Sequence, residues 1–177
     1  MAARLPIFNS LSRPAPAAGL ILAVALLTLA GAWIFQAMGY LPCELCLKER
    51  YPYYAALPLA AAALFLARNG QVKIAKAILA LLAAIFFAGA LFGAYHAGVE
   101  WKFWPGPQDC SGPINSFGSA KDLMKTLSNI SIVRCDQAAW RFLGLSLAGW
   151  DVLVSLLLAA IAAWGVKAAF ALRRNEA

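Results

Sequence analysis

The sequence is poor in charged residues and in histidine. Charged residues make up only 13% of the 177 residues, there is one histidine, and 63% of the residues are hydrophobic. The mean hydropathy of +0.72 is more apolar than a soluble domain of this length can hide inside one core, which excludes an ordinary soluble fold and indicates a membrane protein. A single histidine also leaves few ligands for a metal centre.

Other absences narrow the function further. The net charge is +7, yet no basic stripe with interleaved aromatic residues is present, so we expect no nucleic-acid partner. The chain has no internal repeat, and its main compositional bias is the alanine and leucine typical of spanning helices. We therefore expect a single domain over residues 1–177, whose positive charge reflects membrane topology and contact with lipid.

Four apolar stretches approach the roughly 20 residues that a helix needs to cross a bilayer. They cover residues 17–38, 51–67, 74–95 and 147–170, and the second is the shortest. This pattern predicts an all-α membrane protein built as a bundle of four transmembrane helices. The first stretch also resembles the apolar core of a cleaved signal peptide, but it continues through Phe35 to spanning length, so we expect it to be retained as a helix.

The distribution of lysine and arginine predicts the orientation of the bundle, because cytoplasmic loops retain positive charge. Basic residues gather before the first span, between the second and third, and after the last. In the two loops on the other side, residues 39–50 and 96–149, basic and acidic residues nearly balance. We therefore expect both termini in the cytoplasm and both of these loops outside it.

The longer outer loop contains a short amphipathic segment. Ser119 and Asp122 form a Ser-x-x-Asp pattern that resembles a helix capping box. In the residues that follow, apolar side chains share one helical face: Leu123, Met124, Leu127 and Ile130. We expect a short helix that lies on the outer membrane surface.

All four cysteines lie in the two outer loops. Cys43 and Cys46 are in the first and Cys110 and Cys135 in the second, and because disulfides persist outside the cytoplasm, two can exist at once. A Cys43–Cys46 bridge closes a very small ring that restrains almost no chain, whereas this spacing suits reversible thiol–disulfide exchange. A Cys110–Cys135 bridge would close the loop that holds the surface helix and could equally be structural.

Two other interpretations of the cysteines stay open at this point. A Cys-x-x-Cys pair can be half of a zinc site, although Cys110 and Cys135 lack a second close spacing and His96 is the only histidine. Two inert structural disulfides are the second alternative, against which the small ring of the first pair argues. We expect redox chemistry and no metal.

Arg50 lies at the outer mouth of the second span, against the positive-inside tendency. It needs a lipid headgroup, an acidic side chain such as Glu49, or a ligand. If the helix is already formed at Cys43, then Cys43, Cys46 and Arg50 share one face. Pro52 leaves the start of this helix open, because it either kinks the helix or lies in a first turn that begins near Arg50.

These residues resemble the bacterial DsbB family of disulfide-bond formation proteins. The likeness rests on the four-span layout, on Pro42-Cys43-Glu44-Leu45-Cys46-Leu47-Lys48-Glu49-Arg50, and on Cys135 followed by Trp140-Arg141-Phe142-Leu143-Gly144-Leu145. It covers nearly the whole chain. A Cys-x-x-Cys motif alone is weak, but with Arg50 and a second outer cysteine pair before the last span it is specific.

The resemblance implies an inner-membrane thiol oxidase coupled to a quinone of the membrane pool, either ubiquinone or menaquinone. By this likeness Cys110 would form a mixed disulfide with a periplasmic thiol oxidase of the DsbA type, and Cys135 would relay the disulfide to Cys43. Cys46 would meet the quinone ring, and Arg50 would hydrogen-bond a quinone oxygen. The two outer loops would then face the periplasm.

His96 corresponds to a histidine near the quinone in this family and could polarise or protonate a quinone oxygen, although a histidine in this position more often anchors a membrane interface. Glu100 is open to similar interpretations. The alternatives to a thiol oxidase are an enzyme of the vitamin K epoxide reductase type, and a non-enzymatic membrane protein with structural disulfides or a metal site.

Overall fold

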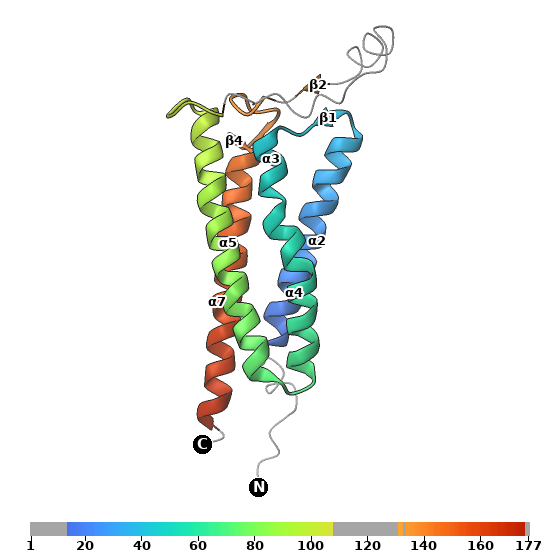
Figure 1. Ribbon diagram of the computed structural model, residues 1–177, viewed down its shortest axis with the longest axis vertical. Helices are drawn as coiled ribbons and strands as arrows, with labels where there is room; N and C mark the ends of the chain where they lie inside the picture. Colours follow the sequence, from blue (N-terminus) through green and yellow to red (C-terminus); the bar gives the residue numbers. More distant parts are fainter. Residues whose placement is uncertain (1–13, 108–130, 133, 176–177) are drawn as a thin grey trace.

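The computed structural model describes residues 14–107, 131–132 and 134–175. Over these residues the chain is mostly helical, and its long helices lie side by side along one axis (Figure 1): α2 (Ala15–Ala37), α4 (Tyr51–Arg68), α5 (Val72–Glu100) and α7 (Leu147–Asn175). Helices α2, α5 and α7 are long and apolar enough to cross a membrane. The expectation of a mostly helical membrane protein is confirmed.

The upper end of α5 extends beyond the predicted stretch 74–95. The helix continues to Glu100 and closes when the backbone N–H groups of Lys102 and Phe103 donate to carbonyls of its last turn, with Lys102 at a φ of 64°. Backbone geometry, rather than the end of the apolar run, therefore ends this helix. The predicted outer loop, residues 96–149, is therefore wrong at its start, because residues 96–100, including His96, belong to α5.

The second predicted span begins after a break in the helix. A short helix, α3 (Glu44–Glu49), carries the Cys-x-x-Cys motif, and α4 starts anew at Tyr51 with Arg50 at its N-cap. Pro52 lies in the first turn of α4, where its missing N–H has no intrahelical partner to lose. Of the two possible starts for this helix, the structure has the one near Arg50.

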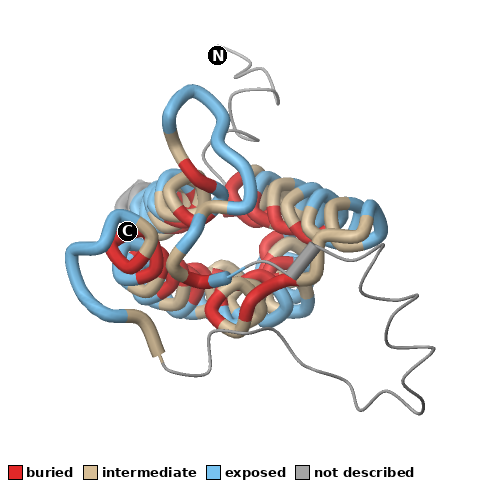
Figure 2. Tube along the Cα trace, turned by 90° about the horizontal axis from the view of Figure 1, so that it is seen from above, coloured by how far each residue is buried: buried red, intermediate tan, exposed pale blue. Residues whose placement is uncertain are grey.

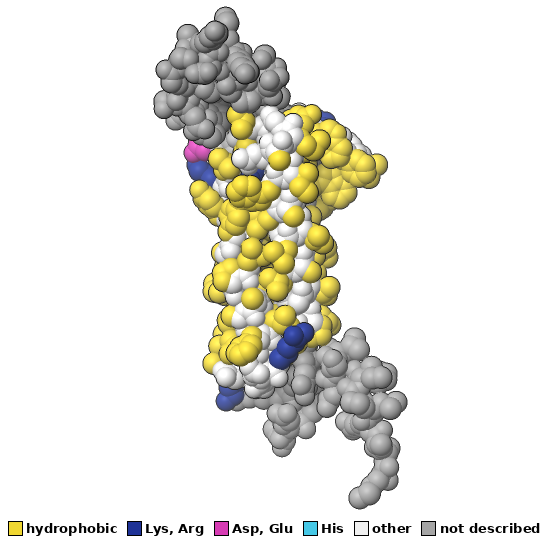
Figure 3. Space-filling model, turned by 90° about the vertical axis from the view of Figure 1, so that its right-hand side faces the viewer, with side chains coloured by type: hydrophobic (Ala, Val, Ile, Leu, Met, Phe, Trp, Pro, Cys, Tyr) yellow, Lys and Arg dark blue, Asp and Glu magenta, His cyan; other side chains and the backbone are white. Residues whose placement is uncertain are grey.

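Small residues let the helices approach one another closely. Buried residues face the centre of the bundle, and exposed residues face outward (Figure 2). At Gly165 of α7 an added Cβ would lie 2.6 Å from the Cβ of Ala17 and 2.9 Å from Leu79, so only glycine fits where α7 crosses α2 and α5. Hydrophobic side chains cover the outside of the shaft, and the lysine and arginine side chains that are visible lie near its two ends (Figure 3).

Two small sheets lie at the opposite end of the bundle. Strand β1 (Tyr40–Leu41) pairs in parallel with β2 (Ser131–Ile132), and β3 (Arg141–Phe142) pairs with β4 (Leu145–Ser146) through a turn with positive φ at both central residues. The β1–β2 ladder holds the segment that leads into Cys43 beside the one that leads into Cys135. The predicted surface helix, Cys110 and hence the Cys110–Cys135 bridge lie outside the described residues.

Candidate redox site

The Cys-x-x-Cys motif lies at the start of α3. Cys43 is the N-cap of this helix, and its Sγ accepts a hydrogen bond from the backbone N–H of Cys46 at 3.2 Å. This bond turns the side chain back toward the first helical turn, so that the two Sγ atoms lie 2.6 Å apart. Cys43 is fully buried, whereas Cys46 is partly buried and lines a cavity between the helices.

Cys135 joins the motif from the far part of the chain. It is fully buried in one cluster with Cys43 and Leu45, against which Cys46 and Phe92 pack. The two cysteines are far apart in the sequence, and the parallel pairing of β1 with β2 explains how they meet. Three of the four predicted redox cysteines therefore share one site.

The segment that carries Cys135 is anchored to the end of α5. Asp136 accepts hydrogen bonds from Lys102 Nζ at 2.9 Å and from Arg134 Nε at 3.0 Å. These two cations hold the pKa of Asp136 below its usual range. The ion pairs are solvent-exposed, so each stabilises the fold only slightly, but together they orient the chain next to the buried cysteine.

His96 connects the thiols to a buried carboxylate. Its Nε2 lies 3.8 Å from Cys43 Sγ, and its Nδ1 lies 2.8 Å from Glu49 Oε1. His96 is 2% exposed and Glu49 is 9% exposed. With the proton on Nδ1, the ring donates to Glu49 and offers Nε2 as an acceptor for the Cys43 thiol. The arrangement Cys43–His96–Glu49 can thus take a proton from the inner cysteine.

Glu49 is a site residue that the sequence analysis considered only as a partner of Arg50. Burial raises the pKa of Glu49, and its hydrogen bond with His96 acts in the opposite direction. Its position three residues after Cys46, on the same face of α3, is the signal that could have identified it. The proposed Arg50–Glu49 pairing is therefore corrected, since the carboxylate faces His96.

Replacing Glu49 with leucine should destabilise the fold. The substitution keeps a side chain of similar size but leaves His96 Nδ1 buried without its acceptor, which costs about 1–3 kcal/mol. The free energy of unfolding would be measured with denaturant in detergent micelles. Glu44→Leu is the matched control, because Glu44 forms only a half-exposed pair with Lys48 at the same helix and should change stability by less than about 0.5 kcal/mol. Equal effects of the two substitutions would contradict the buried pair.

The two thiols of the motif should also differ in reactivity. The hydrogen bond with Cys46, together with burial, raises the pKa of Cys43, and the weaker effect of His96 opposes this. Cys43 in the reduced protein therefore stays a thiol at neutral and mildly alkaline pH, whereas the reactive species is the thiolate. In the reduced protein at about pH 8, iodoacetamide should alkylate Cys46 at least about tenfold faster than Cys43, as measured by peptide mass spectrometry. Faster labelling of Cys43 would contradict this description.

Arg50 is held by α2. Its Nη1 donates to Gln36 Oε1 at 2.9 Å, and its Nη2 lies 3.5 Å from the carbonyl oxygen of Ala32. Arg50 is the single residue between α3 and α4, and its backbone keeps right-handed helical dihedrals, with φ -77° and ψ -21°. Arg50 and Cys46 line the same cavity.

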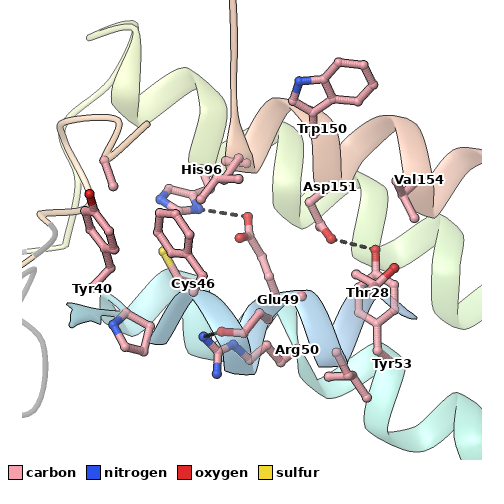
Figure 4. A pocket seen from close by; sticks show the side chains of 18 of the residues that line it. Thr28, Tyr40, Cys46, Glu49, Arg50, Tyr53, His96, Trp150, Asp151 and Val154 are labelled. Atoms are coloured by element: carbon pink, nitrogen blue, oxygen red, sulfur yellow. Dashed lines mark hydrogen bonds and ion pairs between the residues drawn. The ribbon is translucent and has the colours of Figure 1, made fainter. Parts of the chain in front are cut away.

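This cavity has a volume of about 400 Å³ and is bounded by α2, α3, α4, α5 and α7 (Figure 4). Its wall is mostly apolar, with a few polar side chains that include Arg50, His96 and Glu100. A largely apolar cleft of roughly 300–1,000 Å³ with a few convergent polar groups is typical of a small-molecule site. Arg50 supplies hydrogen-bond donors in this wall, so its residues fit an apolar ring that carries hydrogen-bond-accepting oxygens, which is the chemistry of a quinone.

A second polar pair lies further along the same cavity. Tyr53 donates a hydrogen bond from its hydroxyl to Asp151 Oδ1 at 2.6 Å, and its oxygen lies 3.1 Å from Ser155 Oγ. Neither Tyr53 nor Asp151 is among the site residues predicted from the sequence. The signal for Asp151 was available, because a carboxylate within an apolar spanning stretch is costly and usually functional. Nothing local in the sequence identifies Tyr53.

The thiols and His96 could also hold a metal. One ligand atom from each of Cys43, Cys46 and His96 lies within 4.8 Å of the others. A structural zinc site normally needs four protein ligands, and a catalytic one needs three with an open position. Three ligands match the number in a catalytic zinc site, so zinc binding remains an alternative to redox chemistry here. The sequence predicts that no metal is bound.

Comparison with known proteins identifies the family. The family model described as "Disulfide bond formation protein DsbB" matches residues 14–165, which is most of the chain. The chain belongs to the DsbB family. A disulfide bond formation protein B of Verminephrobacter eiseniae is 30% identical over 157 residues, which cover 84% of this chain and 85% of that protein. The uncharacterized protein RP370 of Rickettsia prowazekii is 23% identical over 141 residues, which cover 78% of this chain and 79% of that protein.

Membership of the DsbB family confirms the resemblance drawn from the Cys-x-x-Cys motif, Arg50 and the second cysteine pair. It places the protein in the machinery of disulfide-bond formation and supports a general role as a thiol oxidase. The packing of Cys43, Cys46 and Cys135 in one cluster is consistent with a role in disulfide-bond formation.

Proposed function

We propose that this DsbB-family protein is a quinone-dependent thiol oxidase of the bacterial inner membrane. It reoxidises a periplasmic thioredoxin-fold oxidase of the DsbA type and passes the electrons to ubiquinone or menaquinone. The observation that carries the proposal is the division of the Cys-x-x-Cys pair between two surroundings. Cys43 packs against Cys135, and Cys46 lines the cavity with Arg50.

The first exchange takes place in the long outer loop. A thiolate of the reduced partner attacks Cys110 of a Cys110–Cys135 disulfide and releases the Cys135 thiolate. The second thiolate of the partner then attacks the mixed disulfide, which frees Cys110 as a thiolate. The partner is oxidised by two electrons, and this cysteine pair is reduced by two.

The second exchange passes these electrons inward. The Cys135 thiolate attacks Cys43 of a Cys43–Cys46 disulfide and displaces the Cys46 thiolate, and attack by Cys110 on Cys135 then restores the outer disulfide and releases Cys43. The buried cluster of Cys43 with Cys135 supports this step. His96 and Glu49 are placed to hold the proton of Cys43 when its thiol is released and to take it when the disulfide forms again.

The last step restores the Cys43–Cys46 disulfide. The two thiols lose two electrons and two protons as the sulfur–sulfur bond forms. When bound, a quinone supplies the acceptor chemistry, because it takes up two electrons and two protons to become the hydroquinone. Arg50, fixed by Gln36, presents guanidinium donors next to Cys46 for this acceptor, and the apolar walls exclude water.

The charge at the ends of the bundle supports the proposed orientation. Arg68 is the last residue of α4, and Lys73 and Lys76 lie in the first turns of α5, at the end opposite α3 and the small sheets (Figure 1). With this basic end in the cytoplasm, the redox cysteines face the periplasm, where disulfides persist.

The test is a quinone-reduction assay with the purified protein in detergent. A reduced thioredoxin-fold oxidase is the electron donor, and a short-chain ubiquinone or menaquinone is the acceptor. We expect two electrons transferred per donor disulfide formed, and a mixed disulfide between the donor and Cys110 when the exchange is trapped. Absence of quinone reduction with stoichiometric bound zinc would instead support the metal alternative, and thiol-dependent reduction of a quinone epoxide would support the vitamin K epoxide reductase type.

A further inference from the structure

The Tyr53–Asp151 pair has no role in the thiol exchange, yet it lies in the wall of the redox cavity. Asp151 comes from α7 and Tyr53 from α4, and in Figure 4 the pair lies beyond Glu49 and Arg50 when the cavity is followed away from Cys46. Tyr53 is fully buried. A carboxyl group and a phenol are costly to bury in a mostly apolar wall, and ionisable residues inside a membrane usually have a function.

The hydrogen bonds fix the direction of each donor. The single hydroxyl proton of Tyr53 goes to Asp151 Oδ1 at 2.6 Å, so the 3.1 Å contact with Ser155 must use the Ser155 proton. This chain from Ser155 through Tyr53 holds the carboxyl group in place. The other oxygen, Oδ2, is buried and has no hydrogen-bond partner among the described residues. It lies beside Gly93 of α5, where an added Cβ would be 3.2 Å away.

No lysine, arginine or histidine forms an ion pair with this carboxyl group within the described part of the chain. Of the basic residues in the cavity wall, Arg50 is bonded to Gln36, and His96 to Glu49. An ionised carboxylate with one bare oxygen in an apolar wall carries a large desolvation cost. A neutral carboxylic acid avoids this cost, accepts from Tyr53 on one oxygen and has an O–H to donate from the other.

We propose that Asp151, held by Tyr53, is a second hydrogen-bonding contact for the quinone ring, made from α7 while Arg50 contacts the ring from the junction of α3 and α4. This inference rests on the proposed function. A quinone carries two carbonyl oxygens on opposite sides of its ring, and each accepts hydrogen bonds. Arg50 meets one of them, and the acid O–H of Asp151, which lines the same cavity, meets the other. Tyr53 is a positioning residue, because it acts through Asp151.

The experiment measures binding in the fully oxidised protein, which cannot turn over. A short-chain ubiquinone is titrated into the protein in detergent, and Kd is taken from the quenching of tryptophan fluorescence, since Trp150 lines the cavity. Asp151→Leu should raise Kd about tenfold, as expected for the loss of one hydrogen bond to a buried acceptor. Asp151→Asn keeps a donor and should stay within about threefold of the unmodified protein. Leu153→Ala, at an exposed position of the same helix, is the control and should not change Kd.

Infrared spectroscopy gives a second readout that does not depend on binding strength. The unmodified protein should show the C=O band of a protonated carboxylic acid that disappears in Asp151→Asn, shifts in Tyr53→Phe and shifts again when the quinone is added. These spectra keep the proposal testable even if Asp151→Leu does not fold.

The outcomes separate this inference from the proposed function. An unmodified protein that binds no quinone overturns the proposed function. Normal quinone binding by the unmodified protein, with an unchanged Kd in Asp151→Leu, overturns only the role of Asp151. Equal loss of binding in Asp151→Leu and Asp151→Asn, or carboxylic acid bands that are the same in Asp151→Asn as in the unmodified protein, also contradicts a hydrogen bond donated by this acid.

Discussion

Replacing Cys46 with serine should lower the rate of quinone reduction by about 1,000-fold or more, to background. Serine cannot form the disulfide with Cys43, so in the proposed function the electrons from Cys135 would have no path to the cavity. The thermal stability should change little, because the ring between these two cysteines restrains almost no chain. The measurement is the initial rate of quinone reduction with a reduced thioredoxin-fold donor, together with the unfolding temperature.

A matched control lies inside the same motif. Glu44→Ser introduces a serine between the two cysteines but keeps both sulfurs, and Glu44 forms a half-exposed ion pair with Lys48 at the surface of α3. Its rate should stay within about twofold of the unmodified protein. Undiminished quinone reduction in Cys46→Ser would rule out Cys46 as the point where electrons leave the protein. A large loss of stability without any redox activity to lose would indicate a structural disulfide.

Replacing Arg50 with methionine should raise the KM for quinone about 10- to 100-fold, the usual cost of one charge-assisted hydrogen bond in a buried site. Methionine fills a similar volume but has no donor. Arg50→Lys keeps the charge but loses the planar fork that contacts Gln36 and the cavity together, so we expect an intermediate value. The measurement is the dependence of the rate on quinone concentration at saturating thiol donor.

Arg68→Met is the matched control, since Arg68 lies at the other end of α4, away from the cavity. It should leave KM unchanged. If Arg50→Met reduces the unfolding temperature but not the affinity for quinone, then the role of Arg50 is to tie α2 to α4 through Gln36. In that case His96 and Asp151 would be the remaining candidates for the hydrogen-bond donor to the quinone oxygen.

Much of the redox motif was evident in the sequence because its residues are neighbours in the chain. Cys43, Cys46 and Arg50 lie within one short segment, and their spacing alone predicts redox chemistry at the mouth of a helix. The partners of these residues were not evident. Arg50 bonds to Gln36, and Glu49 bonds to His96, which lies 47 residues away.

The sequence by itself determined that this is a mostly helical membrane protein, on which side its cysteines are expected and to which family it belongs. These properties depend on local hydropathy, on charge counts and on short motifs, which are written along the chain. Only the tertiary structure decided that Cys135 meets Cys43, that Glu49 supports His96, and that Tyr53 and Asp151, 98 residues apart, share the wall of one cavity. The reason is physical. A spanning helix is apolar on every side, so its hydrophobic pattern does not reveal which face turns inward, and that rotation is fixed only when the helices pack.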